Sequence, residues 1–243
     1  MCNNTTKIHF IFDLDDTLYD LAEPFYQAHR DIFSEYPEID CKELFDKFRI
    51  HADIILHKEK AGLIPPEECM PLRIKRTYAE VGWELDSDTI KCFEKTYRYY
   101  QKHIYLPEEI KNLLNECKEL NIPMFIFSNG KSLAQRNKIK ALGLDTWFFD
   151  DHIFISEEVG FLKPRLEAFL GVQNAIGIEP GQIWYVGDTY DADVIGSKNA
   201  GWNVIWFNHR KRSVEKNLAD ITVETTENLL EKLKKLVGAE KIL

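Results

Sequence analysis

Short apolar runs alternate with longer amphipathic stretches along most of this chain, and this alternation restricts its possible folds more than any other feature. The runs lie at residues 8–12, 122–127, 153–155, 183–186 and 203–207. A short, nearly continuous apolar run is typical of a strand buried on both faces of a parallel sheet. The sequence therefore predicts a parallel sheet built from these segments.

The amphipathic stretches between the runs predict helices at residues 107–120, 131–142, 164–176, 191–200 and 226–237. In the first stretch, Ile110, Leu113, Leu114 and Cys117 recur at the spacing of one helix face. Strands that alternate with helices indicate an α/β fold, here a Rossmann-like, doubly wound parallel sheet with helices on both faces.

Residues 21–98 interrupt this alternation, because they are charged and helical in pattern and contain no convincing strand. Pro65 and Pro66 break the segment internally. We expect an all-helical domain of residues 21–98, inserted after the first strand of a core formed by residues 1–20 and 99–243. A chain of 243 residues is long enough for a core domain with a smaller insert.

The composition argues against several classes of protein. A formal net charge of -9 argues against nonspecific nucleic-acid binding, which needs clustered Lys and Arg. The cysteines, at positions 2, 41, 69, 92 and 117, are odd in number and lack CxxC spacing, so we expect neither a disulfide framework nor a zinc site. No signal peptide is recognisable, and no apolar stretch approaches the roughly 20 residues that span a bilayer. We expect a cytoplasmic monomer or homodimer that binds neither nucleic acid nor membranes, with the basic segment 209–212 as a surface loop.

Polar residues follow several of the predicted strands at the point where each strand ends. Asp13 and Asp15 follow the first strand, Ser128 follows the second, and Asp188 follows the fourth. In an open parallel sheet, ligands bind in the crevice beyond the carboxyl ends of the strands. The sequence thus predicts a functional site at that edge.

Asp13 and Asp15 stand two residues apart and are able to face one pocket. A hard cation such as Mg²⁺ prefers oxygen ligands and few protein carboxylates. A solvated, Asp-rich turn is the simpler alternative. A calcium loop of the EF-hand type needs Gly at its sixth position and Glu at its twelfth, where this chain has Leu18 and Pro24.

Three further segments offer groups for phosphate or metal. Residues 128–130, Ser-Asn-Gly, open a predicted helix and form either an anion site or an ordinary cap. Lys163 begins the next helix and becomes informative only if the fold brings it to the same edge. Asp188, with Asp193 one helical turn later, offers a second metal carboxylate and a supporting acid, or an ordinary loop.

Taken together, DLDDT at 13–17, SN at 128–129, KP at 163–164 and GDTYDAD at 187–193 resemble the haloacid dehalogenase superfamily of hydrolases. The segments occur in the family's order, on a core that covers about two thirds of the chain. The helical insert resembles the family's helical cap, which closes over the active site. The resemblance implies a phosphatase that uses Mg²⁺.

Residue by residue, the resemblance implies that Asp13 is the nucleophile that becomes an aspartyl phosphate. It implies that Asp15 protonates the leaving oxygen and then activates water, and that Ser128, Asn129 and Lys163 bind the phosphoryl group. The implied metal ligands are the side chains of Asp13 and Asp188 and the backbone carbonyl of Asp15. The implied supporting residues are Thr17, which braces the turn, and Asp193.

The expected substrate is a small phosphorylated metabolite, either a nucleoside monophosphate or a sugar phosphate. A sugar-phosphate mutase and a haloacid dehalogenase of the same superfamily are alternatives. Asp15 favours phosphate esters over haloacids, because a halide leaves without a proton. A phospho-accepting signalling or binding protein is an alternative of another class, but a receiver domain carries its phosphoacceptor on the third strand, where this sequence has no clear Asp.

Overall fold

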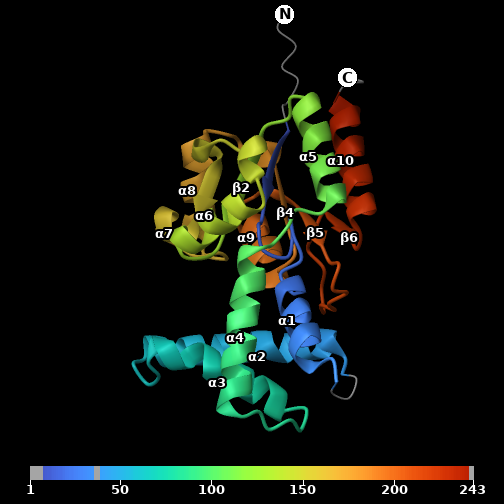
Figure 1. Cartoon of the computed structure of the whole chain (residues 1–243). Helices are drawn as coiled ribbons and strands as arrows, with labels where there is room; N and C mark the ends of the chain where they lie inside the picture. The colour runs from blue at the N-terminus through green and yellow to red at the C-terminus, as the bar shows by residue number, and fades with distance from the viewer. Residues whose placement is uncertain (1–7, 36–38, 241–243) are drawn as a thin grey trace, which may run out of the picture. The chain divides into compact units, whose positions relative to one another are not determined.

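The computed structural model describes residues 8–35 and 39–240, in which six parallel strands form one sheet (Figure 1). The strands are β1 (His9–Phe12), β2 (Met124–Ser128), β3 (Ile153–Ile155), β4 (Ile183–Gly187), β5 (Asn203–Phe207) and β6 (Ile221–Val223). Their order across the sheet is β3-β2-β1-β4-β5-β6. The predicted α/β fold with a doubly wound parallel sheet is confirmed.

The direction in which the chain adds strands reverses at β1, and this reversal creates the crevice of the fold. From β1 the chain builds outward through β2 to β3, then returns and places β4 on the other side of β1. Ile11 pairs with Phe125 on one side and with Tyr185 on the other. The loops after β1, β2 and β4 therefore leave the same edge around a topological switch point, where ligands bind in open α/β sheets.

The sequence does not predict β6, which pairs with β5 through Trp206 and Thr222. Its three residues include Thr222, which is exposed, so no apolar run of strand length marks the segment. Only its position beside β5 defines it as a strand.

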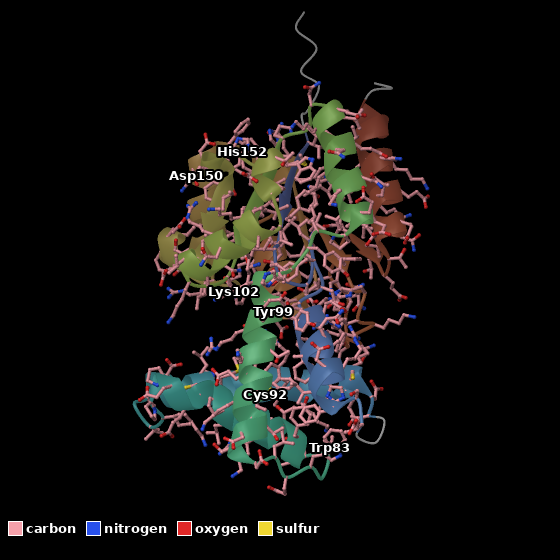
Figure 2. The ribbon with its side chains drawn as sticks, in the orientation of Figure 1. Trp83, Cys92, Tyr99, Lys102, Asp150 and His152 are labelled. Carbon is pink, nitrogen blue, oxygen red and sulfur yellow. The ribbon has the colours of Figure 1, made fainter. Side chains whose placement is uncertain are left out.

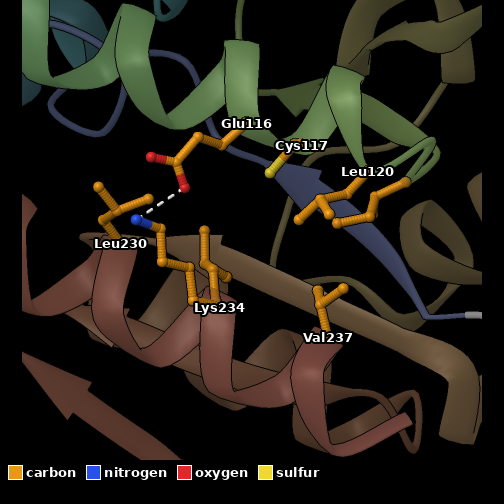
Figure 3. A pocket seen from close by; sticks show the side chains of 8 residues that line it. Glu116, Cys117, Leu120, Leu230, Lys234 and Val237 are labelled. Carbon is orange, nitrogen blue, oxygen red and sulfur yellow. Dashed lines mark ion pairs between the residues drawn. The ribbon is translucent and has the colours of Figure 1, made fainter. Parts of the chain in front are cut away.

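Helices cover both sides of the sheet. Helix α5 (Glu108–Glu119) and helix α10 (Thr226–Glu240) lie side by side (Figure 1). Figure 3 shows apolar side chains between them and an ion pair of 2.9 Å from Lys234 Nζ to Glu116 Oε2. Helix α8 (Leu166–Ile176) packs through Phe169 and Val172 onto strand residues that include Ile11, Phe127 and Tyr185.

Two of the predicted helices differ from the observed ones. The helix expected at 164–176 begins only at Leu166, because the backbone of Lys163 is bonded to the side chain of Asn129. The helix expected at 191–200 is a π-helical segment, η4 (Tyr190–Ile195), followed by α9 (Gly196–Asn199). The Asp193 side chain accepts a hydrogen bond from the Thr189 backbone N–H, which caps the start of this segment.

The remaining short elements of the core connect these strands and helices. They are α6 (Ser132–Ala141), α7 (Ser156–Val159), η1 (Leu144–Thr146), η2 (Asp150–His152) and η3 (Pro180–Gln182). Of these, α6 matters most for the site, because it follows β2 directly.

Residues 21–104 form a second compact unit, and residues 1–20 with 105–243 form the first. The second unit contains α1 (Glu23–Phe33), α2 (Cys41–Lys60), α3 (Pro66–Ala79) and α4 (Ser87–Lys102). An aromatic cluster that includes Phe25, Phe48, Tyr78, Phe93 and Tyr97 forms its core. Helix α4 continues through the boundary expected at 98, because no Gly or Pro ends it there.

Within the described residues, no helix has both the length and the apolar character to cross a bilayer. The described cysteines, Cys41, Cys69, Cys92 and Cys117, are free thiols, and Cys92 is exposed on α4 (Figure 2). Cys2 lies outside the described residues.

Gly196, at the start of α9, provides a test of the packing beneath α8. A Cβ at this position would lie 2.4 Å from two ring carbons of the buried Phe169 and 3.3 Å from the Cα of Pro164. We expect Gly196→Ala to lower the free energy of unfolding by about 1–3 kcal/mol, because overpacking forces neighbouring groups to move. Gly181→Ala is the control, since a Cβ at Gly181 meets nothing within 4 Å. Denaturant unfolding of both variants measures the difference, and equal stabilities would contradict the tight contact.

Candidate active site

Asp13 occupies the position directly after β1, and the sheet holds its backbone. Its N–H donates to the carbonyl oxygen of Val186 at 2.8 Å, which continues the pairing of β1 with β4 by one residue. The chain then turns sharply, with Asp16 at a φ of 64°. Asp tolerates this left-handed conformation better than most residues.

An arginine from the loop after β5 holds the turn in place. Arg210 donates to the two carboxylate oxygens of Asp16 at 2.5 and 2.6 Å and to Asp20 at 2.7 Å. Burial would raise the pKa of Asp16, but His209 and the Arg210 guanidinium hold it well below its usual range. A two-point Arg–carboxylate contact fixes geometry as well as charge, so the loop 13–17 has a defined shape.

Lys163 is the buried cation at the centre of the site. Its Nζ lies 2.8 Å from Asp13 Oδ1 and 2.7 Å from Asp193 Oδ1. It also donates to the hydroxyl of Tyr185 at 2.6 Å, and that hydroxyl donates to the carbonyl oxygen of Phe127 at 2.8 Å. Burial alone would lower the pKa of Lys163, but the charges of Asp13 and Asp193 raise it above its ordinary value. Lys163 is therefore a buried, positively charged side chain at this edge of the sheet.

Asn129 holds the backbone of Lys163. Asn129 Oδ1 accepts from the N–H of Lys163 at 2.8 Å, and Asn129 Nδ2 donates to its carbonyl oxygen at 3.0 Å. Both ends of the amide are thus engaged with the segment after α7. Any contact of Asn129 with phosphate would have to come from its backbone.

Three buried acids gather at the edge of the sheet. Carboxylate oxygens of Asp13, Asp188 and Asp193 all lie within 4.8 Å of one another. Burial raises the pKa of Asp13 although Lys163 opposes the rise, and burial with the neighbouring acids raises the pKa of Asp188 well above its ordinary value. The local negative charge thus exceeds what Lys163 alone can balance.

This acid cluster fits a hard divalent cation, because its donors are carboxylate oxygens at a spacing that a small ion can bridge. Asp193 accepts hydrogen bonds on both oxygens, from Lys163 and from the Thr189 N–H. Arg212 Nη1 lies 2.9 Å from Asp188 Oδ2 and supplies a second positive charge. Asp188 also accepts on both oxygens, from Arg212 and from the Thr189 hydroxyl, and all three acids lie where they could offer an oxygen to one ion.

The carboxylate of Asp15 has separate partners. It is bonded to Lys138 and Gln135 of α6 and to Tyr19. Although burial would raise the pKa of Asp15, the charge and hydrogen bonds of Lys138, with those of Tyr19 and Gln135, lower it. Asp13 and Asp15 thus belong to two different charge networks.

The other predicted residues lie at the same edge. Ser128 is buried at the end of β2, and its Oγ accepts from Gln135 Nε2 at 2.8 Å, which leaves the hydroxyl proton available for donation. It precedes α6 by several residues instead of opening the helix, which begins at Ser132. Thr17 is buried, and its hydroxyl has no hydrogen-bond partner among the described residues.

Sequence reasoning missed six side chains of the site: Tyr19, Tyr185, Gln135, Lys138, Arg210 and Arg212. The interpretation of 209–212 as a surface loop is wrong for Arg210, whose side chain is 9% exposed. The position of this basic run directly after a predicted strand was an available signal, but the sequence did not indicate which acids it would meet. Tyr185 reads simply as a strand residue.

Comparisons with known proteins point to one family of hydrolases. Residues 10–207 match the family described as haloacid dehalogenase-like hydrolase. The N-acylneuraminate-9-phosphatase of Homo sapiens is 32% identical, over 81% of this chain and 81% of the relative. The glyceraldehyde 3-phosphate phosphatase of Pyrococcus furiosus is 26% identical, over 95% of this chain and 94% of the relative.

The comparison of structures finds a similar fold. The solved structure of the HAD-hydrolase YfnB from Bacillus subtilis, bound to magnesium, superposes with a TM-score of 0.68. It is 24% identical and covers 95% of this chain and 98% of that one, so it shows the fold alone. Because the family match spans most of the chain and the human relative is 32% identical over 81% of it, this protein belongs to the haloacid dehalogenase-like hydrolases.

Proposed function

We propose that this hydrolase is a phosphomonoesterase that acts on a small phosphorylated metabolite through an aspartyl phosphate on Asp13. The observation that carries the proposal is the contact of 2.8 Å between Asp13 and the buried Lys163, beside Asp188 at the switch point of the sheet. The names of the human and Pyrococcus furiosus relatives, both phosphatases, support it.

Asp13 is the proposed nucleophile. Its carboxylate attacks phosphorus, the bond from phosphorus to the leaving oxygen breaks, and Asp15 gives that oxygen a proton. Water then attacks the aspartyl phosphate, Asp15 takes the water's proton, and phosphate leaves with Asp13 restored. Dividing the hydrolysis in this way replaces one difficult step by two easier ones.

Charge compensation is what the site must provide, because a carboxylate approaches an anion. Lys163 supplies a fixed positive charge next to the attacking oxygen. The hydroxyl proton of Ser128 and the backbone of Asn129 are proposed to bind phosphoryl oxygens. Thr17 supports the turn, and Asp193 orients Lys163 through their contact of 2.7 Å.

A magnesium ion is proposed to bind the side chains of Asp13 and Asp188 and the backbone carbonyl of Asp15. When bound there, it would screen the repulsion between the carboxylate of Asp13 and the phosphate. The raised pKa of Asp188, caused by burial and by neighbouring acids, is consistent with a site that needs additional positive charge. The magnesium bound by YfnB supports the choice of ion.

Other reactions of the superfamily differ at Asp15. A dehalogenase releases halide, which needs no proton, whereas an alkoxide leaving group needs the proton that Asp15 is proposed to supply. A mutase would pass the phosphoryl group to a second hydroxyl and release no phosphate.

The substrates named for the two relatives favour a sugar phosphate over a nucleoside monophosphate. We further propose that the helical unit 21–104 acts as the cap that selects the leaving group.

Asp13→Asn tests the nucleophile. We expect phosphate release from a phosphomonoester with Mg²⁺ to fall below about a tenth of the wild-type rate, because the amide cannot form the covalent intermediate. Asp145→Asn, an exposed acid of the same unit, is the control and should keep full activity. Mass spectrometry of the quenched wild-type enzyme should locate phosphate on Asp13. Full activity of Asp13→Asn, or phosphate trapped on another residue, would contradict the assignment.

Metal removal tests the ligand set. We expect chelation to stop turnover, Mg²⁺ to restore it, and Ca²⁺ to inhibit, since Ca²⁺ accepts more ligands in looser geometry. Calorimetric titration should show that Asp188→Asn weakens Mg²⁺ binding at least about tenfold, or roughly 1.4 kcal/mol. Asp15→Asn should retain most of the affinity, because its proposed ligand is a backbone carbonyl. Equal losses in the two variants would refute this division of roles.

A further inference from the structure

Arg73 of α3 is a partly buried cation whose side chain is fixed in place. Its guanidinium carbon lies 3.4 Å from the centroid of the Phe48 ring, and its Nε–H donates to the carbonyl oxygen of Phe48 at 2.8 Å. Phe48 is itself buried in the aromatic core of the unit 21–104, with its ring centroid 5.4 Å from that of Tyr97. A planar guanidinium that is stacked on a ring and anchored through Nε has little freedom to rotate.

Within the described part of the chain, the charge of Arg73 has no acidic partner. An arginine has five N–H donors, and the bond to Phe48 uses the one on Nε. The two terminal nitrogens carry the other donors, and among the residues that the structure describes they have neither a hydrogen-bond acceptor nor a carboxylate in an ion pair. Buried charges in proteins are normally paired, because the loss of water is costly. The end of this side chain is therefore available to an anion.

The charges around Arg73 leave this part of α2 and α3 positive. Burial lowers the pKa of Arg73 to about 10, Arg49 acts in the same direction, and Tyr97 and Asp53 oppose them. The guanidinium thus stays charged at neutral pH. Arg49 is exposed on α2, and it too has no ion pair with any residue that the structure describes. Asp53 offsets one of the two arginines, so a single positive charge remains, in a chain whose net charge is -9.

These features suit a carboxylate. The terminal nitrogens of a guanidinium present parallel N–H groups, which match the two oxygens of a carboxylate or a phosphate. The single remaining positive charge balances one carboxylate, whereas a phosphate monoester carries roughly -1.5 to -2. In the proposed active site the phosphate that is transferred already has a cation, Lys163. The arginine is thus suited to a second, singly charged group of the same substrate.

We propose that Arg73, assisted by Arg49, binds a carboxylate on the leaving group, so that the preferred substrates are phosphate esters of hydroxy acids or sugar acids. This inference rests on the proposed phosphatase function and on the proposed role of the helical unit in selecting the leaving group. Arg73 and Arg49 are binding residues in this scheme, and the steps at phosphorus are those already proposed.

The experiment compares phosphate esters that differ only at the carboxylate. Three matched pairs place it at different distances from phosphorus: 3-phosphoglycerate with glycerol 3-phosphate, 6-phosphogluconate with sorbitol 6-phosphate, and N-acetylneuraminate 9-phosphate with its methyl ester. We measure kcat and KM for phosphate release with Mg²⁺. In at least one pair we expect kcat/KM of the wild type to favour the acid by about tenfold or more, the effect of one charge-assisted hydrogen bond.

Variants of the two arginines test whether they cause this preference. Arg73→Met keeps an apolar side chain over the Phe48 ring but removes the N–H groups. We expect it to lower kcat/KM for the acid by about tenfold or more, mainly through KM, and to leave the neutral partner nearly unchanged. Arg49→Met should weaken the preference by a smaller factor, because this side chain is exposed.

Two further variants separate binding from structure. Arg73→Lys should retain only part of the preference, because an ammonium keeps the charge but lacks the planar pair of N–H groups. It decides the question if Arg73→Met does not fold. Lys75→Met changes an exposed lysine of the same helix and should leave every ester unaffected.

The outcomes are distinguishable. A wild-type preference for the acid that the Arg73 variants reduce selectively supports the inference. The absence of a preference in all three pairs, or an equal loss for the acid and the neutral ester in these variants, overturns it while the phosphatase function stands. A wild-type enzyme that hydrolyses none of these esters, nor p-nitrophenyl phosphate, with Mg²⁺ overturns the proposed function, and this inference with it.

Discussion

The contact of Lys163 with Asp13 and Asp193 is the interaction on which the rest of the site depends. A buried ammonium is strongly disfavoured without partners, and so are buried carboxylates. Lys163 meets this requirement with two carboxylates and the hydroxyl of Tyr185, and Asn129 fixes its backbone. The edge of the sheet thereby gains a rigid cation that faces the proposed nucleophile, with an acid cluster that still carries excess negative charge.

The sheet topology brings these groups together. Asp13 and Lys163 are 150 positions apart in the chain, yet their side chains lie within hydrogen-bonding distance. They meet because β1 lies beside β2, and Asn129, just after β2, bonds the backbone of Lys163 in the segment that follows β3 and α7. The loop after β5 adds Arg210 and Arg212, which neutralise Asp16 and Asp188. Most of the site is thus held by contacts between strand ends.

Two acids that are neighbours in sequence have different electrostatic environments. Asp13 lies in the Lys163 network, beside the acid cluster that suits a metal. Asp15 lies in the Lys138 network on α6, where Tyr19 and Gln135 complete its contacts. A separation of two residues on a sharp turn gives the two acids these different surroundings.

The amino-acid sequence by itself determined the fold class, the strands β1 to β5 and the acids at the strand ends, because hydrophobic periodicity and turn chemistry are local properties. It also carried the resemblance on which the roles of Asp13, Asp15 and Asp188 were predicted. Only the tertiary structure decided that Tyr185 and Asn129 serve Lys163, that Gln135 and Lys138 serve Asp15, and that Arg210 is buried. These pairs join segments that lie tens to hundreds of residues apart. Which side chains meet across such a distance depends on strand order and helix placement, and no local sequence pattern records either.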